Sequence, residues 1–131
     1  MIGLDANVLV RYFAKDDPVQ TPRSIALIES LSASRRGYIP LVALAEFAWV
    51  MGRRFAVKRV VLARIVSTLI ESKEIVLESE ETVSAALRLF QITTIGFADC
   101  LIIRAGQAVQ CDYVATFDRS AARQGWMQLV D

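Results

Sequence analysis

The feature of the sequence that most limits the possible folds is the alternation of short apolar runs with longer segments of helical periodicity. The runs typical of strands are residues 1–4, 38–39, 75–77, 113–117 and 127–130. The segments typical of helices are residues 7–13, a stretch from 16–18 that fades at 34–37, then 41–55, 58–72, 80–90, 97–109 and 120–124. Strands that alternate with helices predict an α/β fold with a parallel sheet and helices on both faces.

The size and hydropathy of the chain favour one domain over residues 1–131 with a substantial core. Its apolar fraction is 54% and its mean hydropathy is +0.40, which is high for a protein of this size. The longest apolar stretch, Leu41 to Met51, is too short to span a bilayer and contains Glu46. The N-terminus has no pattern of a signal peptide. We therefore expect a cytoplasmic protein, outside the membrane, that has a hydrophobic partner surface.

The net charge and the cysteine content exclude few classes of protein. The net charge of +1 does not by itself indicate a nucleic-acid binder, and Cys100 and Cys111 are too few for a disulfide scaffold. Basic residues form two clusters, namely Arg35 and Arg36, and then Arg53, Arg54, Lys58, Arg59 and Arg64. Such clusters are either solvated helix faces or an approach for phosphates, and the sequence leaves both readings open.

Glu46 is the most unusual acid in the chain. It lies inside the run LVALAEFAWVM, which is apolar on all sides and therefore predicts a buried helix. A buried ionised carboxylate costs several kcal/mol unless it is paired or bound to a metal. The two explanations are a metal site and a buried ion pair with an Arg or Lys from another element.

Three further acids stand where a functional site is expected. Asp5 and Asp118 each follow a predicted strand, and ligands of parallel sheets bind outside the carboxyl ends of strands. Each of them is equally well explained as the N-cap of the next helix. Asp99 is either an ordinary acid in the first turn of a helix or a ligand, and its apolar neighbours favour burial. The remaining acids, Glu78 among them, are expected to be solvated or to lie in turns.

The chain contains no histidine, so the usual general base is missing. If the four acids share one pocket, two carboxylates about 5 Å apart repel by about 3 kcal/mol at an effective dielectric constant of about 20. A hard divalent cation such as Mg²⁺ or Mn²⁺ would offset this repulsion. It would also lower the pKa of a bound water and stabilise charge on a phosphodiester.

Four short motifs together give the chain a resemblance to a known family. They are IGLDANVLVRYF around Asp5, VALAEFAWV around Glu46, GFADCLIIRAGQ around Asp99 and DYVATFDRS around Asp118. In this order they resemble the motifs of PIN-domain ribonucleases, and within that superfamily those of the VapC-type toxins of prokaryotic toxin–antitoxin pairs.

The resemblance implies a PIN-like three-layer α/β/α sandwich around a central, mostly parallel sheet. It also implies a Mg²⁺- or Mn²⁺-dependent endoribonuclease that cleaves RNA, forms a homodimer and is neutralised by a small antitoxin. Asp5 and Asp99 would be the principal metal ligands, and Asp118 would complete the site directly or through water. Glu46 would bind metal or orient the attacking water.

Asn7 and Thr116 would hold the carboxylates or waters in place, according to the same resemblance. Many relatives carry a further acid soon after the fourth one, whereas here Asp118 is followed by Arg119 and Ser120. The number of metal ions, one or two, therefore stays open.

Two other functions compete with the nuclease. One is a catalytically inactive PIN-like module that only binds RNA or protein. The presence of all four acids argues against this alternative. The other is an Asp-dependent phosphatase with Asp5 as nucleophile. That chemistry normally needs a second acid in the same loop, where Asn7 stands, and the sequence has no glycine-rich phosphate loop.

Overall fold

The computed structural model describes all residues, 1–131. The elements in chain order are β1 (Ile2–Gly3), α1 (Ala6–Ala14), α2 (Gln20–Glu29), β2 (Gly37–Ile39), α3 (Leu41–Arg53), α4 (Arg59–Glu71), β3 (Ile75–Leu77), α5 (Glu80–Ile92), α6 (Phe97–Ala108), β4 (Ala115–Thr116), α7 (Arg119–Arg123) and β5 (Gln128–Leu129). Every predicted strand and helix is present, with ends displaced by a few residues. No helix combines the length and the hydropathy that crossing a membrane requires.

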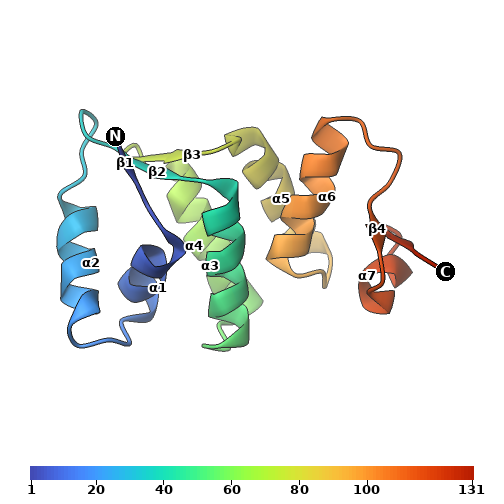
Figure 1. Cartoon of the computed structure of the whole chain (residues 1–131), viewed down its shortest axis with the longest axis horizontal. Helices are drawn as coiled ribbons and strands as arrows, with labels where there is room; N and C mark the ends of the chain where they lie inside the picture. The colour runs from blue at the N-terminus through green and yellow to red at the C-terminus, as the bar shows by residue number, and fades with distance from the viewer.

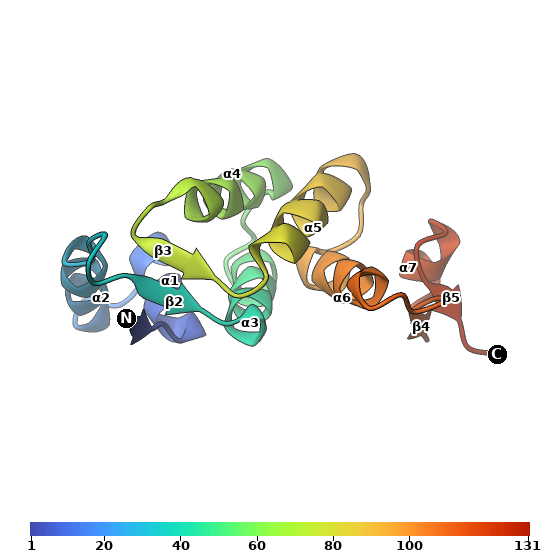
Figure 2. The ribbon, with the colours of Figure 1, turned by 90° about the horizontal axis from the view of Figure 1, so that it is seen from above.

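All strand pairs are parallel, which confirms the predicted α/β fold class. Strands β1, β2 and β3 form one sheet in that order, and β4 pairs with β5 in a second, two-stranded sheet. Helices α5 and α6 lie between the two sheets in both ribbon views (Figures 1 and 2). β1 and β4 therefore each keep one unpaired edge.

The larger sheet buries one row of side chains. Leu4, Ile39 and Leu77 are buried, and α1, α3 and α4 lie on that side of the strands, below them in Figure 1. In the row between, Gly3 is exposed and Tyr38 and Val76 are only half-buried. The alternation follows from the two-residue period of a strand.

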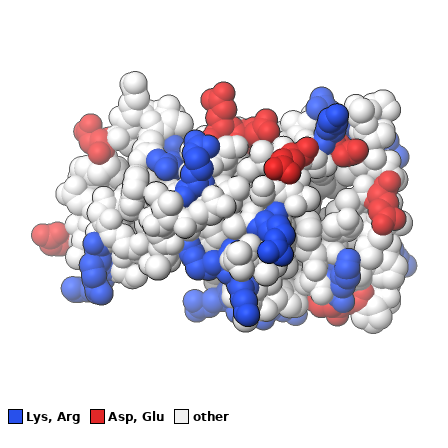
Figure 3. Space-filling view, turned by 180° about the vertical axis from the view of Figure 1, so that it is seen from behind, with Lys and Arg blue, Asp and Glu red and all other residues white.

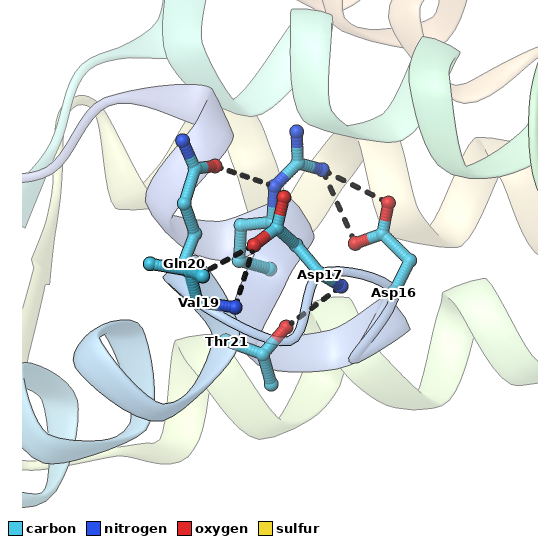
Figure 4. Close-up of polar contacts among 6 residues, drawn as sticks. Asp16, Asp17, Val19, Gln20 and Thr21 are labelled. Carbon is cyan, nitrogen blue, oxygen red and sulfur yellow. Dashed lines mark hydrogen bonds and ion pairs between the residues drawn. The ribbon is translucent and has the colours of Figure 1, made fainter.

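The connection from α1 to α2 is fixed by two neighbouring acids, drawn in Figure 4. The side chain of Asp17 accepts hydrogen bonds from the backbone N–H groups of Val19 (2.9 Å) and Gln20 (2.7 Å), which hold its pKa below the ordinary range. The side chain of Asp16 forms an ion pair with Arg11 at 3.1 Å. A helix thus follows Asp16–Pro18 as predicted, but α2 begins only at Gln20, whose backbone N–H donates to Asp17.

Helix α3 is not buried all round, so the prediction from its apolar sequence was wrong. Its inner face carries Phe47, which is fully buried, whereas the outer face carries Val42 (77% exposed), Glu46 and Trp49 (59% exposed). The helix covers the sheet with one side only, and an apolar residue on the other side finds no neighbour to bury it. Glu46 therefore needs neither a buried ion pair nor a metal to explain its presence.

The C-terminal segment β4–α7–β5 joins the rest of the molecule through α6 and the loop before it. The backbone N–H of Thr94 donates to the side chain of Gln124 at 3.1 Å, and Ala121 and Met127 are buried. A cavity of about 600 Å³ remains beside this segment, lined by Ile103 and other residues of α6 and the segment. The protein exposes 7960 Å², whereas a compact protein of 14.5 kDa exposes about 6,900 Å².

Candidate active site

Asp99 lies in the first turn of α6, whose start is set by Gly96 in an extended conformation. The helix buries Phe97 and Cys100 on either side of it. Asp99 itself is half-buried and lines a pocket of about 350 Å³ between α3 and α6. The prediction that Asp99 has apolar surroundings is therefore confirmed, with its carboxylate at the border of the core rather than inside it.

Two causes, burial and a neighbouring acid, perturb the pKa of Asp99. Burial raises the pKa of Asp99 above its ordinary value, and the negative charge of Asp118 raises this pKa further. The molecule has one ion pair, Arg11–Asp16, so neither carboxylate is paired with a basic side chain. Two acids that repel each other without compensation are unusual in a folded protein and typical of functional sites.

Asp118 is held rigidly at the end of β4, where it caps α7. Its Oδ1 accepts hydrogen bonds from the backbone N–H groups of Ser120 (2.9 Å) and Ala121 (3.2 Å). The hydroxyl of Thr116 in turn accepts a hydrogen bond from the backbone N–H of Asp118 at 3.0 Å. Thr116 therefore positions Asp118 through its backbone, and one carboxylate oxygen of Asp118 has no partner within the protein.

Asp5 also acts as a helix cap. It follows β1, its Oδ1 accepts a hydrogen bond from the backbone N–H of Ala6 at 2.8 Å, and its side chain is exposed. Asn7 makes no side-chain hydrogen bond with Asp5 and lines a separate cavity of about 300 Å³ with Arg11 and Arg23. Helix capping, the alternative explanation of Asp5 and Asp118, is thus observed for both residues. Each caps its helix through Oδ1, so the second carboxylate oxygen can still bind a ligand.

The structure brings two of the four predicted acids together. Asp99 and Asp118 interact, whereas Glu46 is exposed on the outer face of α3 and Asp5 lies at the end of the other sheet. No three of these carboxylates lie close enough to share a metal ion. The separation follows from the division of the strands, because Asp5 and Asp118 stand at the ends of strands that are not neighbours.

The remaining pair still fits a hard divalent cation. Magnesium is commonly held by one or two carboxylates and completes its coordination with waters and substrate phosphates. Asp99 and Asp118 supply two oxygen ligands whose mutual repulsion a cation would relieve. The chemistry of this donor pair, hard oxygen and net negative charge, therefore suits Mg²⁺ or Mn²⁺.

Arg59 supports this site although the sequence placed it only in a basic cluster. Its guanidinium donates to the carbonyl oxygens of Phe90 (2.7 Å), Thr93 (3.1 Å) and Ile95 (2.8 Å), and it stacks 3.8 Å from the ring centre of Phe90. Burial lowers its pKa. These bonds satisfy carbonyl groups at the end of α5 and hold the loop before α6 in place. The loop in turn sets the position of Asp99 at the start of α6. No local signal reveals this role, because the partners are over 30 residues away.

Glu78 is a second long-range cap that the sequence did not reveal. It follows β3, and its carboxylate accepts a hydrogen bond from the backbone N–H of Leu41 at 2.8 Å, at the start of α3. Glu78 is exposed, as expected, but it also has this capping role, which the sequence did not predict. Its role is structural, since its hydrogen bond holds the start of α3, at the opposite end of that helix from Arg53.

Cys100 beside Asp99 does not take part in nucleophilic chemistry. Burial raises the pKa of its thiol to about 11, so the thiol is neutral near pH 7. A neutral thiol is neither a nucleophile nor a metal ligand. The expectation that Cys100 behaves as a small apolar residue agrees with its full burial.

Comparison with known proteins identifies the family. A profile of the PIN domain matches residues 2–126, nearly the whole chain. The chain therefore belongs to the PIN-domain family, whose members are typically metal-dependent nucleases that bind RNA. No curated protein matches the chain.

The charge of Asp99 predicts a gain in stability when it is removed. Because the pKa of Asp99 is higher in the folded protein than its ordinary value of 3.8, the folded state binds more protons between these two values, and stability falls as pH rises through that window. We expect Asp99→Asn to raise the melting temperature at pH 7 in the absence of divalent cations. The advantage should disappear near pH 3 in thermal denaturation followed by circular dichroism.

The matched control for this prediction is Asp112→Asn, which removes an exposed acid outside the site. It should leave the melting temperature nearly unchanged. A destabilised Asp99→Asn protein at pH 7 would contradict the reading of Asp99 as an uncompensated charge.

Proposed function

We propose that the protein is a metal-dependent endoribonuclease that cleaves RNA phosphodiester bonds at the Asp99–Asp118 pair. The observation that carries this proposal is the repulsive pair itself, which has no basic partner and borders a pocket in a PIN domain. A structural role would favour a compensated pair, since uncompensated charges reduce stability. Cation binding gives this pair a physical reason to persist.

Each acid has a distinct part in the proposed site. Asp99 and Asp118 would hold Mg²⁺ or Mn²⁺, and Asp5 would join them only when the two sheets meet. The ion, when bound, would supply charge stabilisation and a water of lowered pKa. Glu46 binds metal or orients the attacking water from the exposed face of α3. Thr116 keeps Asp118 in place through its backbone hydrogen bond.

Asn7, two residues after Asp5 in the chain, would support Asp5 as Thr116 supports Asp118. Both Asp5 and Asn7 are exposed and therefore accessible to ions and substrate. Arg59 acts through Asp99 by fixing the loop that precedes α6. It is a positioning residue rather than a catalytic one.

We further propose that the two sheets join when the site is assembled. The N–H groups of Ile2 and Leu4 bond to β2, so alternation directs the backbone groups of Gly3 to the free edge of β1. In β4 the carbonyls of Val114 and Thr116 accept from β5, which directs Ala115 to its free edge in the same way. Parallel pairing of β1 with β4 would place Asp5 and Asp118 at the same end of one sheet.

Amide hydrogen exchange measured by NMR tests this joining of the sheets. On addition of single-stranded RNA with Ca²⁺ in place of Mg²⁺, which oxygen ligands bind but which supports hydrolysis poorly, we expect the amides of Gly3 and Ala115 to become protected by about tenfold or more, because they acquire hydrogen-bond partners. Tyr38, in the central strand β2, is the internal control and should change little. Fast exchange at both amides in an RNA-saturated complex would contradict the proposal.

The biological role that best fits is that of a toxin in a toxin–antitoxin pair, acting in the cytoplasm. The surface exceeds that of a compact protein by about 1,000 Å², which is comparable to the area that one partner buries in a typical complex. Exposed apolar side chains such as Ile102 and Val60 belong to that surface. We propose that a homodimer mate and a small antitoxin cover it.

The nuclease activity is tested with purified protein and single-stranded RNA. Cleavage should require Mg²⁺ or Mn²⁺ and stop with EDTA. Asp99→Asn, Asp118→Asn and Asp5→Asn should each reduce the rate by about 100-fold or more, because each removes charge stabilisation of the transition state. Asn is chosen because it retains helix capping at Asp5 and Asp118.

The control is Asp112→Asn, which should cleave at the wild-type rate. Cleavage that survives EDTA, or that survives loss of both Asp99 and Asp118, would contradict the mechanism. RNA binding without cleavage under all metal conditions would instead favour the inactive binding module. Release of phosphate from a small ester with an acyl-phosphate on Asp5 would favour the phosphatase.

A further inference from the structure

The pocket that Asp99 borders is lined by three aromatic residues, among them Trp49, and by two arginines. It has a volume of about 350 Å³, within the range of sites for small ligands. Trp49 and Arg53 line it from α3, Asp99 and Phe97 line it from α6, and Arg59 lines it from α4. The candidate catalytic carboxylate and an exposed tryptophan therefore share one cavity.

Trp49 is arranged as a platform with one free face. Its side chain is 59% exposed, although tryptophan usually buries most of its surface. The guanidinium of Arg53, one turn later on α3, lies 5.8 Å from the ring centre, within the range of a cation–π contact. A contact on one side combined with this exposure leaves ring surface for a planar ligand.

The segment that joins α3 to α4, part of which lines the pocket, is basic. Arg53, Arg54 and Lys58 are exposed where α3 ends and α4 approaches, and none of them is paired with an acid. Figure 3 shows Lys and Arg side chains gathered in the lower middle of the molecule, seen from behind. Gly52 and Gly96 also line the pocket, and a methyl group added at either would meet no atom within 4 Å. Both glycines thus face open space.

We propose that this pocket binds a nucleobase of single-stranded RNA beside the cleaved phosphate, with the base stacked on Trp49. Base stacking on an aromatic ring next to basic side chains is the common physical basis of single-strand binding. Arg53 supplies positive charge for a flanking phosphate. The proposal rests on the proposed nuclease function, because it places the scissile phosphate near Asp99.

The charge of the pocket favours RNA over a purely apolar protein partner. A docking helix would bury Arg53, which has no acidic partner, and burying unpaired charge costs free energy. An RNA strand instead brings a base for the ring and phosphates for the cations. Arg59 already donates hydrogen bonds to four backbone carbonyls, so Arg53 is the arginine of the pocket that is free to bind phosphate.

The experiment uses the full chain and single-stranded oligoribonucleotides with Ca²⁺ in place of Mg²⁺, a hard cation that oxygen ligands bind but that supports hydrolysis poorly. Trp126 is the only other tryptophan, so Trp126→Phe makes Trp49 the sole fluorophore. Its fluorescence should be quenched as oligoribonucleotide is added. By fluorescence anisotropy, Trp49→Ala should bind about tenfold more weakly, whereas Trp49→Phe, which keeps an aromatic face, should bind nearly as well as the wild type.

Cleavage kinetics separate binding from chemistry. Trp49→Ala should raise KM for single-stranded RNA with little change in kcat, because Trp49 holds a base and does not touch the reacting atoms. Trp126→Phe should leave both constants unchanged. Unaltered RNA affinity in Trp49→Ala would overturn the proposal, as would light scattering in which Trp49→Ala only converts a dimer to a monomer.

The same data distinguish the two proposals. If the wild type cleaves RNA and Trp49 is irrelevant to binding, only the base-binding site is wrong. If no cleavage occurs but Trp49 is quenched by the oligoribonucleotide, the base-binding site stands and the nuclease function is wrong.

Discussion

The repulsion between Asp99 and Asp118 is the interaction on which the site depends. Burial and the neighbouring negative charge both raise the pKa of Asp99, and neither acid forms an ion pair with a basic side chain. The surrounding structure keeps the two together at this cost. Asp118 is fixed by the cap of α7 and by Thr116, and Asp99 is fixed at the start of α6 by the loop that Arg59 clamps.

Hydrogen bonds between distant segments give this arrangement its rigidity. Arg59 ties α4 to the carbonyls at the end of α5, and Glu78 ties the end of β3 to the start of α3. Each of these groups satisfies backbone atoms at a helix end that the helix itself cannot satisfy. The pocket between α3 and α6 is therefore bordered by helices whose ends are fixed, which preorganises Trp49 relative to Asp99.

The sequence predicted the helices and strands well because their signals are local. Apolar residues at helical spacing define α4 and α5, and strand-ending acids mark Asp5 and Asp118 correctly as the ends of β1 and β4. The burial of Glu46 was predicted wrongly, because an apolar run does not reveal which face of a helix finds a partner. Composition alone cannot distinguish a buried helix from a helix with an exposed apolar face.

The features that the sequence did not predict depend on contacts between residues far apart in the chain. The division of the strands into two sheets depends on which edges meet, and strand sequences of two or three residues carry little information on pairing. The caps made by Arg59 and Glu78 join residues more than 30 positions apart. The meeting of Asp99 with Asp118 was expected only through the resemblance to PIN domains, and the separation of Asp5 from them was not expected.

The most direct test of the carboxylate pair is its affinity for metal. Isothermal titration calorimetry with Mn²⁺, without RNA, should detect binding to the wild-type protein and to Asp112→Asn. The heat should be lost or the affinity reduced by about tenfold or more in Asp99→Asn and Asp118→Asn, since each loses a charged oxygen ligand. Equal Mn²⁺ affinity in all four proteins, or no binding to the wild type even at millimolar concentration, would contradict a metal centre at this pair.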